Sequence, residues 1–155
     1  MSTKYATIET SRGAILAELF ARDCPATVEN FERLANAGFF DGVRFHSVDV
    51  GRAVHTGDPL SRGPLPGDSS VGTGGPGYTI PCELIGNRNR HEGGTLSMDH
   101  DGPNTGGSRF CFVLDEAVGE TRDGVHTVFG RVEEGLDAIR AVEPDDVIHS
   151  IRVWE

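Results

Sequence analysis

Two glycine-containing segments have the residue types of ligand-binding loops. Residues 72–77, Gly-Thr-Gly-Gly-Pro-Gly, match the glycine spacing of dinucleotide-binding loops. However, no strand pattern leads into them, and Pro81 follows where the helix after such a loop should begin. Residues 99–102, Asp-His-Asp-Gly, resemble the start of a calcium loop, but the glycine comes too early and no glutamate stands at the twelfth position. Neither segment therefore predicts a nucleotide or calcium site.

Histidine and cysteine side chains could provide a second chemistry, metal binding. His55, His126 and Cys111 could supply three ligands, but isolated histidines more often serve as satisfied surface or core residues. We therefore expect no metal and no cofactor. The cysteines are odd in number and have no CxxC spacing, which predicts free, buried thiols in a reducing compartment. These are Cys24, Cys82 and Cys111.

The charge balance narrows the choice of partners. The 155 residues include 24 acidic and 14 basic side chains, for a formal net charge of −10, and Lys4 is the only lysine. Because phosphate would be repelled by this excess, we expect no nucleic-acid partner. An acidic, lysine-poor surface suits a cytoplasm of high salt, where screening weakens the repulsion. An ordinary acidic protein is the alternative.

Hydropathy indicates neither a membrane protein nor a secreted one. No apolar run approaches the ~20 residues that a membrane-spanning helix needs. Residues 1–5 have neither the basic start nor the apolar stretch of a signal peptide. We therefore expect a cytoplasmic protein without a membrane partner. The length suits a single domain over residues 1–155, and we expect a monomer.

The elements that must position these side chains are mostly short strands. Residues 5–10 and 14–20 alternate with period two, and Pro25 then opens a helix over residues 25–37. Many short strands with glycine-rich turns indicate a barrel or sandwich whose ends two helices could cap. Further strands are predicted at 43–50, 95–98, 109–114, 126–132 and 147–154, a second helix at 133–142, and a long loop at 58–77.

Five longer motifs are more specific than any single residue. They are residues 25–31, Phe45-His46 with residues 56–58, residues 72–78, residues 96–98 with 102–110, and residues 124–130. In this order and spacing they resemble the cyclophilin prolyl isomerases from about residue 5 to residue 154. The resemblance implies a mainly β fold, an eight-stranded antiparallel barrel capped by two α-helices. It also implies cis-trans isomerisation of Xaa-Pro bonds in protein chains.

The chain departs from the family where the resemblance places the proline pocket. Amide resonance sets the ~18–20 kcal/mol barrier to isomerisation, and cyclophilins aim an arginine at the imide nitrogen above an apolar pocket. Here Ser47 takes the place of that arginine. Arg52 replaces a phenylalanine, Ala53 a methionine and His55 a glutamine. The segment Asp99-His100-Asp101 replaces Ala-Asn-Ala, Arg109 replaces a glutamine, and Cys111 replaces a phenylalanine. Thr121-Arg122 replaces a Trp-Leu pair, while His126 is kept.

These departures predict a prolyl isomerase of weak or altered activity that acts on proline-containing polypeptide segments. The predicted catalytic residues are Arg52, His55, Arg109 and His126, with Arg52 or Arg109 supplying the guanidinium that Ser47 lacks. The predicted substrate contacts are Ser47, Ala53, Asp99, His100, Asp101, Cys111 and Arg122. The alternative is a non-catalytic module that binds extended proline-containing or anionic ligands, since Arg52, Arg109 and Arg122 would converge on one groove. These arginines could instead pair with Asp99, Asp101 and Asp123 and bind nothing.

Overall fold

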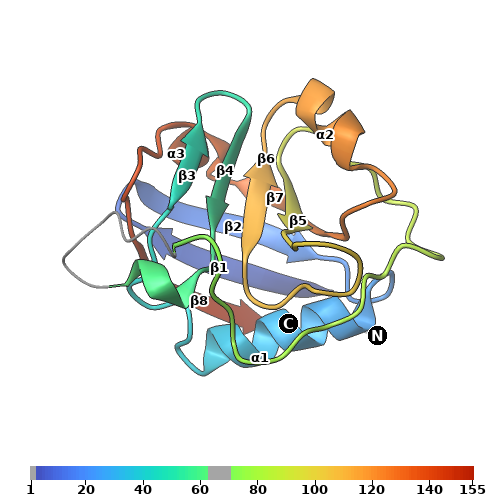
Figure 1. Ribbon diagram of the computed structural model, residues 1–155. Coiled ribbons are helices and arrows are strands. Elements are labelled where there is room, and N and C mark those ends of the chain that lie inside the picture. The colour runs from blue at the N-terminus through green and yellow to red at the C-terminus, as the bar shows by residue number, and fades with distance from the viewer. Residues whose placement is uncertain (1–2, 63–70) are drawn as a thin grey trace.

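The computed structural model describes residues 3–62 and 71–155, so part of the predicted loop at 58–77 lies outside the described residues. Eight antiparallel strands form one sheet in the order β3-β4-β6-β5-β7-β2-β1-β8 (Figure 1). Their bounds are β1 Lys4–Thr10, β2 Gly13–Leu19, β3 Ser47–Asp49, β4 Ala53–Thr56, β5 Thr95–Met98, β6 Phe110–Val113, β7 Val128–Glu134 and β8 Ile148–Trp154.

The sheet curls until its two edges meet. The segment before β3 runs beside the segment before β8, where Phe45 N–H donates to Asp146 O at 2.8 Å and Ile148 N–H donates to Val43 O at 2.8 Å. These bonds join the segment before β3 to the start of β8 and give the backbone groups there partners that an open sheet would lack. The predicted eight-stranded antiparallel fold is confirmed.

The core lies inside this curled sheet and is rich in phenylalanine. Strand residues alternate between the two faces, and Leu96, Phe110 and Phe112 all turn inward. Phe31 lies on the facing helix, with its ring edge-on to that of Phe110 at a centroid distance of 5.3 Å. The phenylalanines predicted to be buried have no exposed surface, and these are Phe45, Phe110, Phe112 and Phe129.

Helix α1, Pro25–Asn36, lies along one end of the curled sheet (Figure 1). Pro25 suits its first turn, but no side chain of the residue before the helix caps it. Glu83 does so from a distant loop, since its carboxylate accepts from Ala26 N–H at 3.2 Å and Thr27 N–H at 2.6 Å. The helix stops before Gly38, whose φ of +80° favours glycine.

Three sequence predictions need correction. The predicted strand 43–50 is reduced to β3, Ser47–Asp49, because Gly51, at φ +74°, turns the chain into β4, Ala53–Thr56, which was not predicted. A helix at Glu116–Arg122, α2, was not predicted, because its one buried residue is Gly119 and no apolar stripe marks it. The helix predicted at 133–142 shortens to α3, Leu136–Arg140, because Glu134 still pairs with β2.

Three further observations complete the description of the fold. A short 3₁₀ turn, η1, spans Pro59–Ser61. Across the described residues, no helix has both the length and the apolar character needed to cross a membrane. All three cysteines are free; Cys24 and Cys111 are buried as predicted, whereas Cys82 is half-buried.

Candidate functional site

A row of four side chains crosses the outer face of the sheet. Ser47 in β3 is directly opposite His55 in β4, His55 is opposite Cys111 in β6, and Cys111 is opposite Ser97 in β5. Their chain neighbours Val54, Phe112 and Leu96 belong to the core. Because side chains alternate along a strand, the row must lie on the face turned away from that core. These four strands lie next to one another in the sheet (Figure 1).

The hairpin end of this face carries a weak ion pair. Arg52 Nε lies 3.2 Å from Asp49 Oδ2, and both side chains are more than half exposed. Such an exposed pair contributes at most about 1 kcal/mol to stability. Ala53, the other residue predicted in this stretch, is buried opposite Val113. Arg52 is therefore held at the hairpin turn by an aspartate that the sequence prediction did not include.

Asp99, just after β5, is the centre of the polar network on this face. Its Oδ2 lies 2.6 Å from His55 Nδ1, and its Oδ1 accepts from Arg122 Nη2 at 2.8 Å. Burial alone would raise the pKa of Asp99, but the hydrogen bond and charge of His55, together with Arg122, outweigh it and hold that pKa at about 2. Asp99 is therefore an anion fixed between two partners.

Arg122 connects this carboxylate to a second chain of polar groups. Its Nη2 also donates to Ser97 Oγ at 3.0 Å, and Ser97 Oγ lies 2.7 Å from His91 Nε2. His91 Nδ1 in turn lies 2.8 Å from Asp123 Oδ1. This order of serine, histidine and aspartate is that of a nucleophilic triad, but Ser97 has no exposed surface. The Ser97 hydroxyl therefore serves to order the network and cannot reach a substrate.

Sequence analysis missed His91 and Ser97, and considered Asp123 only as an alternative partner for an arginine. Among the described contacts, Asp123 instead bonds to both the ring and the backbone N–H of His91. In the sequence, only the Leu-Ser-Met motif at residues 96–98 marks Ser97, and that motif does not indicate that His91 is the partner of Ser97.

Arg109, the residue before β6, is also paired with an aspartate. Its Nη2 lies 2.9 Å from Asp101 Oδ2, and its Nη1 donates to the carbonyl of Gly72. The side chain of Arg109 is 14% exposed, whereas that of Asp101 is 70% exposed. The guanidinium is thus packed against the 72–77 loop with its charge met by Asp101.

His126, the one pocket side chain shared with the family pattern, is neutral in this arrangement. Its Nδ1 donates to the Met98 carbonyl at 2.8 Å, and its ring stacks on His100 at a centroid distance of 4.1 Å. Burial, the nearby Arg122 charge and His100 together lower the pKa of His126 to about 4. Nε2 is therefore left as an unprotonated acceptor near neutral pH.

Cys111 completes the outer row but is fully buried. Burial raises the pKa of its thiol well above the usual value, and the nearby Asp99 charge adds to that shift. Without a metal, Cys111 is therefore an unreactive thiol.

The 72–77 loop requires glycine because it packs closely against Asp58. Asp58 is buried, and its Oδ2 accepts from the N–H groups of Gly72 and Gly74. A Cβ on Gly74 would lie 2.2 Å from Asp58 Oδ1. This protein carboxylate occupies the loop amides, so the loop is a structural element and not a phosphate cradle.

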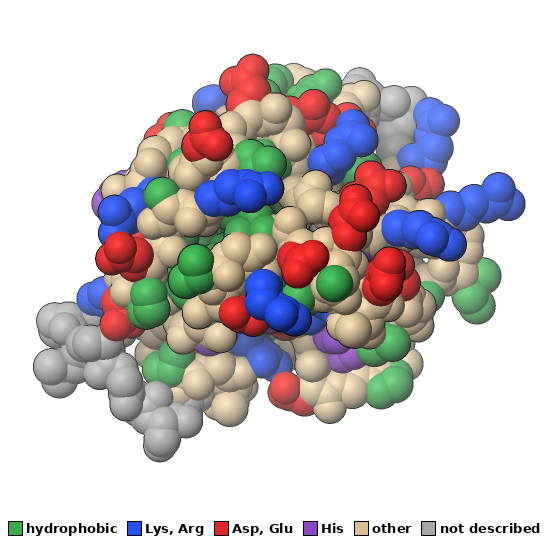
Figure 2. Space-filling view, turned by 90° about the horizontal axis from the view of Figure 1, so that it is seen from above, with side chains coloured by type: hydrophobic (Ala, Val, Ile, Leu, Met, Phe, Trp, Pro, Cys, Tyr) green, Lys and Arg blue, Asp and Glu red, His purple; other side chains and the backbone are tan. Residues whose placement is uncertain are grey.

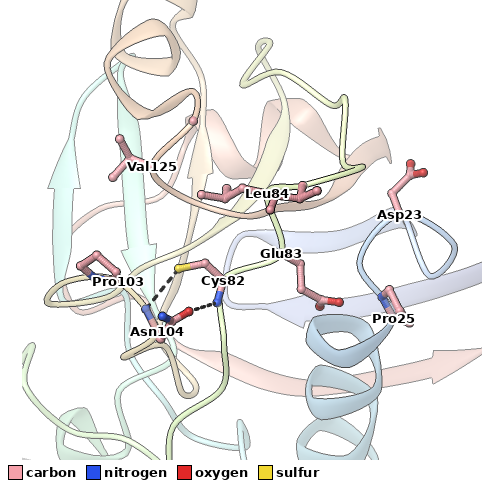
Figure 3. Close-up of a pocket in the computed structure, with 10 residues that line it drawn as sticks. Asp23, Pro25, Cys82, Glu83, Leu84, Pro103, Asn104 and Val125 are labelled. Carbon is pink, nitrogen blue, oxygen red and sulfur yellow. Dashed lines mark hydrogen bonds between the residues drawn. The ribbon is translucent and has the colours of Figure 1, made fainter.

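A separate cavity of about 650 Å³ lies beside the start of α1 (Figure 3). Its wall combines apolar side chains with a backbone clamp, in which Cys82 N–H donates to Asn104 Oδ1 at 2.9 Å and Asn104 N–H to Cys82 Sγ at 3.4 Å. None of the site residues predicted from the sequence lines it. Its apolar lining residues are Pro25, Leu84, Ile85, Pro103 and Val125.

Comparison with known proteins settles the family. The model for the cyclophilin type peptidyl-prolyl cis-trans isomerases matches residues 5–152. The chain belongs to this family. It is 44% identical over 153 residues to peptidyl-prolyl cis-trans isomerase B of Bacillus subtilis, with 99% of each chain covered. It is also 42% identical over 153 residues to a peptidyl-prolyl cis-trans isomerase of Helicobacter pylori, covering 96% of this chain and 86% of that one.

Solved cyclophilins share the fold at lower sequence identity. A Cryptosporidium parvum cyclophilin-type isomerase matches with a TM-score of 0.85 at 23% identity, over 99% of both chains. A second structure of that protein, in the presence of the dipeptide Ala-Pro, matches with a TM-score of 0.84 at 24% identity, over 97% of this chain and 99% of that one. The cyclophilin fold is thus retained although the outer row differs from the family pattern.

Proposed function

We propose that this cyclophilin docks proline-containing segments of protein chains over β3, β4, β6 and β5 and isomerises their Xaa-Pro bonds slowly. The observation that carries the proposal is Ser47, the first residue of β3, directly opposite His55. The family pattern has its arginine at this position. A serine side chain is too short to reach the imide nitrogen of a docked proline from there.

The energetic consequence is large. Loss of one donor that acts in the transition state costs ~10²–10³ in rate, or about 3–4 kcal/mol. The replacement of pocket phenylalanines by Arg52 and Cys111 also removes apolar contact with the ring, at roughly 25 cal/mol per Å². In our proposal His55, His126 and His100 contact the docked chain, while Asp99, Asp101 and Arg122 hold the groove in shape.

The other guanidinium groups near the groove favour a second candidate, a module that binds without turnover. Arg52, Arg109 and Arg122 are each paired with an aspartate. A guanidinium whose charge is already met by a carboxylate at 2.9 Å attracts a further acceptor less strongly, and the carboxylate itself repels an anion. The same pairing weakens the case for an anionic ligand.

Ser47→Arg separates these candidates. Isomerisation of a short Xaa-Pro peptide would be followed by exchange NMR, which reports binding and turnover together. If the groove still seats proline, Ser47→Arg should raise kcat/KM at least about tenfold. Val50→Arg is the matched control, because it adds the same group at a position on this hairpin that is 82% exposed. A folded Ser47→Arg variant that binds peptide but turns over no faster would overturn the proposal.

A further inference from the structure

Three potential metal ligands converge on the outer face of the sheet. The ligand atoms of His55, Asp99 and Cys111 all lie within 4.8 Å of one another. The sheet register places them there, because His55 and Cys111 are cross-strand partners in β4 and β6. Asp99 N–H extends the neighbouring ladder by donating to Arg109 O at 3.0 Å, two residues beyond the Ser97–Cys111 pair. Asp99 and Ser97 therefore lie on the same face.

The donor set suits zinc. Imidazole nitrogen, thiolate sulfur and carboxylate oxygen are all ordinary zinc ligands, and bonds of 2.0–2.3 Å in a tetrahedron place ligand atoms about 3.3–3.6 Å apart. His55 Nδ1 and Asp99 Oδ2, now 2.6 Å apart, would have to separate by about 1 Å, and ligand atoms as far apart as 4.8 Å would have to approach by about 1 Å. Calcium and magnesium are disfavoured, because they prefer oxygen ligands.

The surroundings already orient the carboxylate. Asp99 directs Oδ2 toward His55 Nδ1, while its Oδ1 is held by Arg122. Arg122 is itself fixed by Ser97 Oγ and the Met98 carbonyl. Such outer contacts are worth ~10–100-fold in metal affinity at known sites. With one thiolate, one carboxylate and the Arg122 guanidinium beside that carboxylate, the occupied site would carry a net charge of +1.

We propose that His55 Nδ1, Asp99 Oδ2 and Cys111 Sγ bind one Zn²⁺. The metal replaces the Cys111 thiol proton, which passes to solvent, while neutral His55 carries its ring proton on Nε2 and offers Nδ1 to the metal. Three protein ligands leave a fourth position for water or a donor atom of a docked chain. Side-chain exposures of 27% for His55 and 12% for Asp99 make this position reachable from the groove. The site uses two of the three residues considered from the sequence, with Asp99 in place of His126, and revises the expectation of no metal.

The test is metal binding to the untagged, chelator-treated full chain, measured by calorimetry with Zn²⁺ and by absorption with Co²⁺. We expect one Zn²⁺ per chain and a thiolate-to-cobalt charge-transfer band. Cys111→Ser should abolish the band and weaken Zn²⁺ binding at least about tenfold, and His55→Gln should weaken binding to a similar extent. Cys82→Ser is the matched control and should keep both signals, since Cys82 lies outside the cluster.

The fold of each variant would be checked by circular dichroism before titration. If Cys111→Ser fails to fold, His55→Gln carries the test, because His55 is partly exposed and its replacement opens no core cavity. Absence of stoichiometric Zn²⁺ binding in the wild type would overturn the proposal. So would a Co²⁺ complex without the thiolate band, or folded Cys111→Ser and His55→Gln variants of unchanged affinity. None of these readouts depends on isomerase turnover, so the metal site and the proposed function can fail separately.

Discussion

His126 donates Nδ1–H to the Met98 carbonyl at 2.8 Å while its ring face is covered by His100. A protonated imidazole would carry its charge into a half-buried place beside Arg122. The lowered pKa of about 4 reflects this cost. His126 is thus a neutral side chain held in one tautomer, which suits contact with an uncharged peptide.

This pKa predicts part of the acid sensitivity of the fold. The unfolded chain takes up a proton at His126 below about pH 6.5, whereas the folded chain does so only near pH 4. Stability is therefore complete above pH ~6.5 and is lost as the pH falls toward 4, by about 1–3 kcal/mol after allowance for partial exposure. The free energy of unfolding, measured by urea denaturation, should therefore fall less in His126→Gln than in the wild type between about pH 7 and pH 4.5, and the difference should be that amount.

His149→Gln is the control for this measurement, because His149 is exposed on β8. His46 and His91 also have lowered pKa values, chiefly through burial. Because neither variant changes these two histidines, they contribute the same pH dependence of the unfolding free energy to the wild type and to both variants. Equal pH dependence in the two variants would contradict the assignment to His126.

The fold could be predicted from short-range patterns and the five motifs. The features that the sequence prediction did not find have physical causes. Period-two alternation located β1 and β2, and Pro25 marked the start of α1. The contribution of Glu83 to that helix start could not be read from the sequence, because the two segments are 57 residues apart and meet only in the folded chain. Helix α2 went unseen because it packs through Gly119, where a Cβ would lie 1.9 Å from the His91 carbonyl.

The composition of the site could be predicted, but its pairings could not. The resemblance placed Ser47, His55 and Cys111 on one face, and the register agrees. Which aspartate meets which arginine depends on side-chain direction across strands, which no linear spacing gives. Asp99 and Asp101 form ion pairs with arginines, which was the alternative considered from the sequence, whereas Arg52 pairs with Asp49.

The pocket residues predict weak binding of cyclosporin-type inhibitors, which are ligands of the family. Thr121 replaces the indole donor of the family pattern, and its hydroxyl is already bonded to the Val118 carbonyl at 2.6 Å. Arg52 replaces an apolar wall. Calorimetric titration should therefore give no affinity in the sub-micromolar range. A tighter complex would show that the groove is more intact than these substitutions imply.

The charge excess predicts a fold that salt stabilises. The net charge is −10, and although basic and acidic side chains are interspersed on the face in Figure 2, acidic groups outnumber basic ones over the whole chain. Screening should reduce the repulsion among the 24 carboxylates. The melting temperature should rise from low to molar NaCl, and equally in KCl. Sulfate is avoided because it also strengthens apolar burial. A flat or falling melting temperature would count against adaptation to salt.

The last prediction concerns a donor that could replace the missing arginine. Arg109 and Arg52 both have long side chains, but each guanidinium is paired with an aspartate, Asp101 and Asp49 respectively. The Arg109 pair is the more persistent one, because that guanidinium is 14% exposed and also donates to the Gly72 carbonyl. We therefore expect Arg109→Ala and Arg52→Ala each to change kcat/KM of a short Xaa-Pro peptide by less than about threefold.

Peptide affinity must be measured beside the rate, because the two quantities separate the possible roles. Loss of peptide affinity in Arg109→Ala with unchanged turnover of the bound peptide would mark a binding contact. A fall in rate of about tenfold or more with peptide affinity kept would instead show that the guanidinium swings from Asp101 to the imide nitrogen in the transition state. Asp101→Asn then supplies the converse test, because it releases Arg109 without shortening it. If Arg109 can serve as the donor, Asp101→Asn should raise the rate, and Arg109→Ala in that background should cancel the gain.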